Sequence, residues 1–150
     1  MPDHERPLNA RGLKTAPLMG HLAADRGFHF DAILCSPAKR AMQTAEIFAR
    51  EARFTDKIEI IPSFYPGEPN DHIHHLSRQT NDLSGILIVG HNPGMQLLLK
   101  ALTGKNETMP TATLAHIGLP IQRWNDLSLN SKAELIDIYR PKEIFKELNQ

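Results

Sequence analysis

Several features that would narrow the class of this protein are scarce or missing in its 150 residues. Cys35 is the single cysteine, so no internal disulfide can form, and we expect a reducing, cytoplasmic location. No apolar run approaches the roughly 18 residues that a membrane span needs, and residues 1–6 contain no hydrophobic signal region. The 17 basic and 17 acidic side chains balance, which argues against general binding to nucleic acid or to membrane surfaces. We therefore expect a soluble globular protein whose affinity for any anion is local.

The order of apolar segments and turn residues predicts an α/β fold. Hydrophobic residues make up 41% of the chain and charged residues 23%, which is typical of one globular domain, here residues 1–150. Strands and helices alternate through the first hundred residues, which favours a three-layer α/β/α sandwich with a mostly parallel sheet. Strands are predicted at 28–35 (the strand with its approach), 57–62, 86–89, 111–117 and 133–139. Helices are predicted after Asn9 (kinked at Pro17), from Pro37, from Asp71, from Gly94 and from residues 140–142.

Two of the predicted strands end at residues suited to binding an anion. Residues 86–89 read as a strand buried on both faces, and Gly90 lets the chain turn and present His91 at the carboxyl end. Residues 32–35 form a second strand, which runs into a helix that carries Arg40. Ligands of open α/β sheets bind at the carboxyl ends of strands, so Arg40 and His91 can be directed at one anion.

The chemistry of these two side chains suits a phosphoryl group. The Arg40 guanidinium offers two parallel donors to phosphate oxygens, and His91 can donate a ring proton or act as an acid or base near neutral pH. A helix beginning after each residue adds backbone N–H donors. Taken singly, Arg40 also fits a solvated helix residue, and His91 also fits a hydrogen-bonded turn histidine.

Longer motifs support the phosphate hypothesis through a family resemblance. Residues 36–44 resemble the S-P-x-x-R-x-x-Q-T signature of the histidine phosphatase superfamily, and residues 90–93 resemble its second-histidine motif. Residues 3–12 are similar to the D-x-x-R-P-L-x-x-x-G segment of the SixA-type phosphohistidine phosphatases. Residues 110–112, Trp124 and residues 140–142 fit the carboxyl-terminal pattern of that branch, so the resemblance covers nearly the whole chain.

The resemblance implies a phosphatase that uses neither metal nor cofactor. In this family a nucleophilic histidine takes the phosphoryl group, water hydrolyses the resulting phosphohistidine, and a second histidine and two arginines hold the phosphate. Arg40 matches one of these arginines and His91 the second histidine, so both are the expected catalytic residues. The substrate-binding residues implied are Arg40, His91, Asn92, Ser36 and Arg6. The expected partner is a phosphohistidine-containing protein or a small phosphate compound.

One part of the family pattern is not found in these residues. The nucleophile of the family lies in an Arg-His-Gly or Arg-His-Ala motif after the first strand, and no histidine here has that context. Ser63 stands where many members of the superfamily have an acidic residue. We therefore expect an amino-terminally truncated enzyme that lacks the first family strand and is inactive or very weak. A non-catalytic module that binds phosphate or phosphohistidine, and an inactive fragment, are the alternatives; the oligomeric state is left open.

Three other features have simpler interpretations. His72 and His75 share one helix face, but no third ligand accompanies them, so we expect no metal site and a solvated helix end. Cys35 lies in an apolar strand, where a thiol is usually inert. Trp124 is expected to pack over the sheet.

Overall fold

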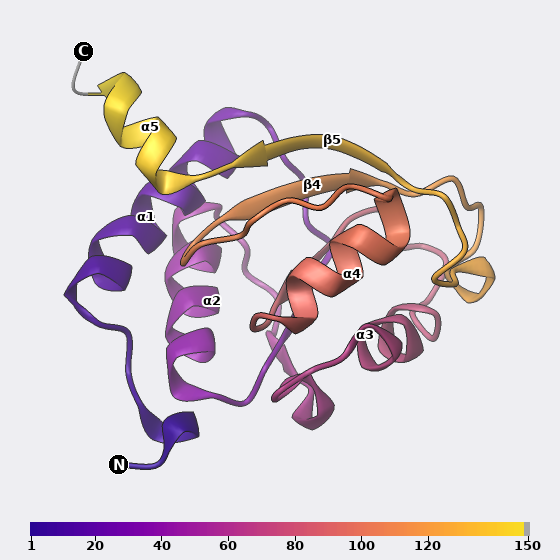
Figure 1. The fold of residues 1–150 in the computed structure, drawn as a ribbon, viewed down its shortest axis with the longest axis horizontal. Coiled ribbons are helices and arrows are strands. Elements are labelled where there is room, and N and C mark those ends of the chain that lie inside the picture. The colour runs from indigo at the N-terminus through magenta and orange to yellow at the C-terminus, as the bar shows by residue number, and fades with distance from the viewer. Residues whose placement is uncertain (149–150) are drawn as a thin grey trace. The chain divides into compact units, whose positions relative to one another are not determined.

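The computed structural model describes residues 1–148, and the chain forms two compact units (Figure 1). The first unit comprises Met1–Pro66 and Asp82–His91, and the second comprises Gly67–Asn81 and Asn92–Gln150. A single domain over residues 1–150 therefore stays a prediction. Within residues 1–148, none of the helices combines the length and the apolar character that a membrane span requires.

A parallel sheet of three strands forms the centre of the first unit. β1 (Ala32–Cys35) lies between β2 (Glu59–Ile60) and β3 (Ile86–Val89), and all three run in the same direction. The predicted α/β class and parallel sheet are thus confirmed. β2 is shorter than the predicted strand at 57–62, because a 3-10 turn, η2 (Pro62–Phe64), begins where proline can no longer donate to a strand partner.

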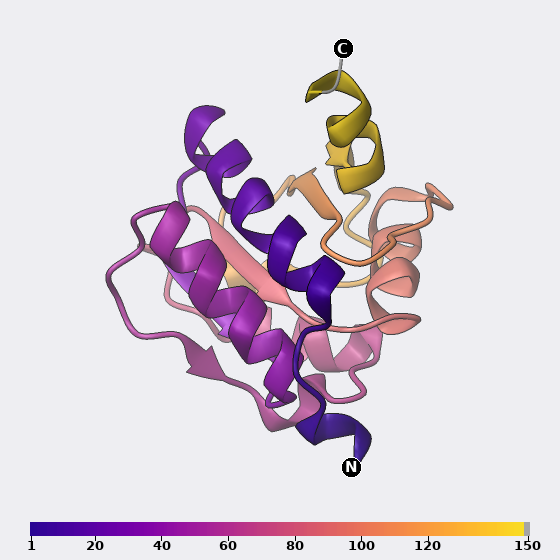
Figure 2. The same cartoon turned by 90° about the vertical axis from the view of Figure 1, so that its left-hand side faces the viewer.

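Two long helices of the first unit lie side by side (Figure 2). α1 (Ala10–Asp25) is capped as expected, because the Asn9 side chain accepts a hydrogen bond from the Gly12 N–H at 2.8 Å. The helix continues through Pro17. α2 (Lys39–Glu51) begins two residues after the predicted Pro37 and contacts both β1 and β3.

The burial of the strands follows their place in the sheet. In β1, Ile33, Leu34 and Cys35 are all fully buried, since this strand has a neighbour on each side. In β3, Leu87 is buried and the other three residues are half-buried, although the sequence predicts burial on both faces. β3 pairs with β1 alone among the described residues, so its second edge lacks the cover that a central strand has.

The carboxylate of Asp31 fixes the start of β1 against the segment that leads into β3. It accepts hydrogen bonds from the Ser84 N–H at 2.7 Å, the Ser84 hydroxyl at 2.9 Å and the Gly85 N–H at 3.1 Å. These donors, led by the backbone N–H of Ser84, hold the pKa of Asp31 well below its ordinary value. The Asp31 N–H in turn donates to the Gly85 carbonyl at 2.8 Å, which sets the two parallel strands in register.

The second unit contains helices and an antiparallel pair of strands. α3 (Pro69–Leu76) packs against α4 (Gly94–Thr103), and β4 (Leu114–Gly118) pairs with β5 (Glu134–Tyr139) before α5 (Pro141–Leu148). The β4–β5 pair is a separate sheet with antiparallel direction, whereas the sequence predicts one mostly parallel sheet. Trp124 is buried in a 3-10 turn, η3 (Trp124–Asp126).

His72 differs from the solvated position expected from the sequence. Its side chain is fully buried, and a Cβ on Gly94 would lie 3.5 Å from its Cε1 atom. This close packing between α3 and α4 removes the ring from water, which lowers the pKa of His72.

The packing of α1 against α2 predicts that alanine substitutions of Gly20 and Gly12, two glycines of α1, have different effects on stability. A Cβ on Gly20 would lie 2.8 Å from the Glu51 Cβ and 3.2 Å from the Phe48 Cα, neither of which can rotate away. We expect Gly20→Ala to lower the free energy of unfolding by about 1–3 kcal/mol, because overpacking outweighs the gain in helix propensity.

Gly12→Ala is the matched control. Its Cβ would meet the Leu8 Cδ2 atom at 2.7 Å, and this terminal methyl can move aside. Urea denaturation of both variants checks the difference, and equal stabilities would contradict the close approach of the two helices.

Candidate active site

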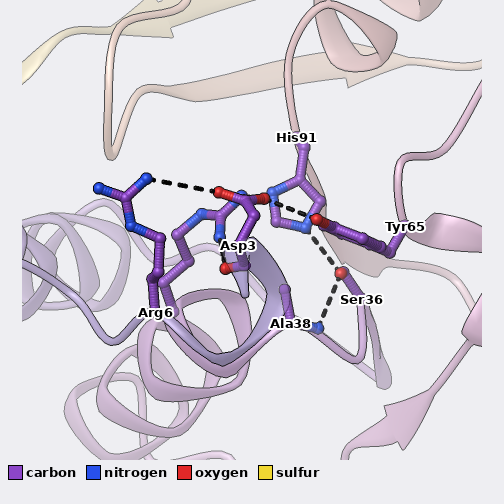
Figure 3. A network of polar contacts seen from close by, with 7 residues as sticks. Asp3, Arg6, Ser36, Ala38, Tyr65 and His91 are labelled. Carbon is purple, nitrogen blue, oxygen red and sulfur yellow. Dashed lines mark hydrogen bonds and ion pairs between the residues drawn. The ribbon is translucent and has the colours of Figure 1, made fainter. Parts of the chain in front are cut away.

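The carboxyl ends of β1 and β3 bring Ser36 and His91 into contact. Cys35 pairs with Val89 in the parallel register, so the residues that follow each strand leave the sheet together. The Ser36 Oγ and the His91 Nε2 lie 2.7 Å apart and share a hydrogen bond, although the two residues are 55 positions apart in sequence. The same Oγ accepts the Ala38 N–H at 3.1 Å, as Figure 3 shows. A fully buried serine thus fixes both the His91 ring and the turn into α2.

Arg40 projects from the first turn of α2 and binds Asp3 with both ends of its guanidinium. Its Nη2 lies 3.0 Å from the Asp3 Oδ2, and its Nη1 donates to the Asp3 carbonyl at 2.8 Å. The Tyr65 hydroxyl donates to the same Oδ2 at 2.6 Å. The Tyr65 ring in turn meets the His91 ring edge-on, with 5.5 Å between centroids. Arg40 and His91 therefore belong to one group of side chains within the first unit.

The Asp3 side chain contacts Arg6, Arg40 and Tyr65. Figure 3 shows the Asp3 side chain between Arg6 and Tyr65, beside the His91 ring. Arg6 is largely exposed, and its Nη1 lies 3.8 Å from the Asp3 Oδ1, so it is the weaker of the two cationic partners.

Electrostatics in this group favour a charged Asp3 and a neutral His91. Hydrogen bonds from Tyr65 and then from Arg40 hold the pKa of Asp3 below its ordinary value, and the same bond raises the pKa of Tyr65. Burial lowers the pKa of His91, the Arg40 charge lowers it further, and the Asp3 charge opposes both. The site thus combines a neutral imidazole with a guanidinium and a phenol that already hold an anionic oxygen.

The remaining predicted binding residue, Asn92, belongs to the second unit. Its Nδ2 donates to the Met109 carbonyl at 2.7 Å and to the Gln96 Oε1 at 3.1 Å, so it fixes the start of α4 to the segment that precedes β4.

The contacts of Asp3 and Tyr65 in this site were not predicted from the sequence. Asp3 is part of the D-x-x-R-P-L segment, so a signal for it existed, but nothing in the motif indicates that its carboxylate meets Arg40. Tyr65 follows η2 in a loop and carries no motif, so only the three-dimensional arrangement shows its hydroxyl at Asp3.

Cys35, the last residue of β1, is fully buried. Burial raises the pKa of the Cys35 thiol to about 12, which keeps it protonated and inert, as expected from the sequence. Among residues 1–148, no three His, Cys, Asp or Glu side chains are grouped so that they could hold a metal ion.

Comparison with known proteins indicates the same family as the sequence motifs. Residues 2–64 match the sequence model of the histidine phosphatase superfamily (branch 1). A candidate phosphohistidine phosphatase SixA from Agrobacterium tumefaciens is similar in structure, with a TM-score of 0.79 and 29% identity over 94% of this chain and 87% of that one. The chain resembles the histidine phosphatases in both sequence and fold. The resemblance inferred from the motifs is thus confirmed.

One further solved structure and two uncharacterized proteins are also similar to this chain. The protein histidine phosphatase SixA complexed with tungstate has a TM-score of 0.82 and 22% identity, covering 95% of this chain and 89% of that chain; this likeness concerns the fold. The uncharacterized protein ML1117 of Mycobacterium leprae is 29% identical over 93% of this chain and 89% of its own length. The uncharacterized chloroplastic protein At3g52155 of Arabidopsis thaliana is 29% identical over 75% of this chain and 56% of its own.

The charges around His91 predict opposite shifts of its pKa in two variants. Arg40→Gln removes the cation that disfavours the imidazolium, so we expect the pKa of His91 to rise. Asp3→Asn removes the anion that favours the imidazolium, so we expect it to fall. An NMR pH titration of the ring, assigned by the signal lost in His91→Asn, checks both. A pKa that stays unchanged in both variants would show that the two charges lie away from the ring.

Proposed function

We propose that this chain is a phosphohistidine or phosphomonoester phosphatase, with Arg40 and His91 as catalytic residues in the phosphate pocket. The observation that carries the proposal is that Arg40 and Tyr65 already bind an anionic oxygen, that of the Asp3 carboxylate, beside the half-buried imidazole of His91. Phosphoryl transfer needs this combination of a guanidinium and neutral donors, because negative charge develops on the equatorial oxygens of the phosphoryl group.

Each of the proposed residues has a distinct task. Arg40 donates hydrogen bonds from its two Nη atoms to two phosphoryl oxygens, in the same way that it donates to the carboxylate and the carbonyl of Asp3 in this structure. Ser36 positions the His91 ring through the bond to Nε2, and neutral His91 acts as a donor or acceptor for a further oxygen. Arg6 and Asn92 are proposed to contact the substrate outside the phosphoryl group.

The relatives support the choice of substrate class. One similar structure is a protein histidine phosphatase with tungstate, a tetrahedral oxyanion, and another is a candidate phosphohistidine phosphatase. We therefore propose a phosphohistidine-containing protein or a small phosphate compound as the partner, and a cytoplasmic location. Neither a metal nor a cofactor enters the proposed reaction.

The rate at which residues 1–150 hydrolyse a phosphate compound depends on whether they contain a nucleophilic histidine. These residues contain no Arg-His-Gly or Arg-His-Ala sequence, and a histidine nitrogen must accept the phosphoryl group before water can hydrolyse it. We propose that residues 1–150 alone turn over very slowly. Because Arg40, Tyr65 and His91 nevertheless lie in one group of side chains, a non-catalytic module that binds phosphate or phosphohistidine is the second candidate.

Arg40→Gln tests the phosphate pocket. We expect the affinity for inorganic phosphate to fall at least about tenfold, because a charge-assisted bidentate contact worth roughly 1.5–3 kcal/mol is lost. Arg50→Gln, which removes the same charge from the exposed end of the same helix, is the control and should change the affinity less than about twofold. Isothermal titration calorimetry measures both, and equal losses in the two variants would refute a local site at Arg40.

Addition of a nucleophile separates the enzyme from the binding module. Residues 1–150 preceded by an apolar strand that ends in Arg-His-Gly should hydrolyse a phosphohistidine peptide at least about a hundredfold faster than residues 1–150 alone, since covalent catalysis replaces a direct attack by water. The same extension ending in Arg-Asn-Gly is the matched control. Phosphate binding without turnover in every form would favour the binding module.

A further inference from the structure

The donors of the proposed phosphate pocket are already engaged by one residue of the protein itself. Asp3 takes both Nη atoms of Arg40, one through its carboxylate at 3.0 Å and one through its carbonyl at 2.8 Å. The Tyr65 hydroxyl donates to the same carboxylate oxygen at 2.6 Å. A phosphoryl group that is to be held by all of these donors must therefore displace both the carboxylate and the carbonyl of Asp3.

The chain presents this carboxylate on a short tether. The backbone forms a 3-10 turn, η1 (Asp3–Glu5), closed by a hydrogen bond from the Arg6 N–H to the Asp3 carbonyl at 3.1 Å. Two residues later, the Leu8 N–H donates to the Gln43 Oε1 at 2.7 Å, which attaches the segment to α2. A carboxylate held this close to its partners competes as a ligand at millimolar effective concentration or above.

The same carboxylate has an open route away from the site. Half of the Asp3 side chain is exposed, with a relative accessibility of 52%, and Arg6 beside it is 67% exposed. Its release therefore exposes charged groups to water rather than opening the apolar core.

We propose that Asp3 is an internal competitor of the phosphoryl group. When a dianionic ligand binds, both Nη atoms of Arg40 and the Tyr65 hydroxyl exchange the oxygens of Asp3 for phosphoryl oxygens. The inference rests on the proposed function, because it assigns the same pocket to the phosphoryl group. It adds Tyr65 as a ligand-binding residue and gives Asp3 control over affinity. No covalent bond changes, since the step exchanges hydrogen bonds and one ion pair.

Asp3→Asn tests the competition through the affinity for inorganic phosphate. The amide keeps the shape of the side chain but loses the charge that holds Arg40, so we expect the variant to bind phosphate about threefold to tenfold more tightly than the parent chain. Tyr65→Phe in the Asp3→Asn background should remove part of that gain. Isothermal titration calorimetry gives the affinities, and thermal unfolding verifies that each variant is folded.

Glu5→Gln is the matched control for net charge. Glu5 lies in the same 3-10 turn and carries the same charge, but its carboxylate lies 3.8 Å from the His4 ring instead of on Arg40. We expect Glu5→Gln to change the phosphate affinity less than about twofold, because an exposed charge acts only through the screened field. An equal gain in both variants would show that net charge, and not displacement, controls the affinity.

Acetate provides a readout that a purely structural role of Asp3 would not produce. In Asp3→Asn, free acetate should compete with phosphate, since it replaces the missing carboxylate, whereas in the parent chain it should have much less effect. Unchanged or weaker phosphate binding in Asp3→Asn, with Arg40→Gln still lowering the affinity at least about tenfold, would overturn the proposed competition and leave the proposed function standing. Phosphate binding that is absent or independent of Arg40 in every variant would overturn both.

Discussion

The parallel pairing of β1 with β3 is the constraint on which the proposed site depends. The register Cys35 to Val89 brings together two chain segments more than 50 residues apart, so that Ser36 and His91 leave the sheet at the same edge and bond at 2.7 Å. Asp31 maintains this register from the opposite end of the strands through three hydrogen bonds that its carboxylate accepts. A shift by one residue would separate Ser36 from the imidazole and reverse the face of every side chain in the strand.

Much of this arrangement was predictable from the sequence, because strand ends and helix starts have strong local signals. The apolar run at 86–89 predicted β3 with its correct bounds, β1 lies at the end of the predicted segment 28–35, and Asn9 marked the start of α1. The burial of β3 was overestimated, since apolar composition does not reveal whether a strand lies at the centre or the edge of a sheet. The direction of β4 and β5 was also beyond local patterns, because pairing is decided by contacts distant in sequence.

The candidate site shows the same division between local and distant information. Arg40 and His91 follow directly from motifs at strand ends, whereas the contacts of Asp3 and Tyr65 depend on loops whose paths no periodicity describes. Electrostatics then couple these residues. The anion on Asp3 is stabilised by Arg40 and Tyr65, while its charge partly offsets the effect of Arg40 on the imidazole of His91. The protonation of His91 therefore depends on the charges of both Arg40 and Asp3.

The hydrogen bond from the Leu8 N–H to the Gln43 side chain has a mechanical consequence. It attaches the chain to α2 immediately before the Asn9 cap of α1. A change in the conformation of residues 1–7 would therefore not need to disturb the packing of α1 against α2.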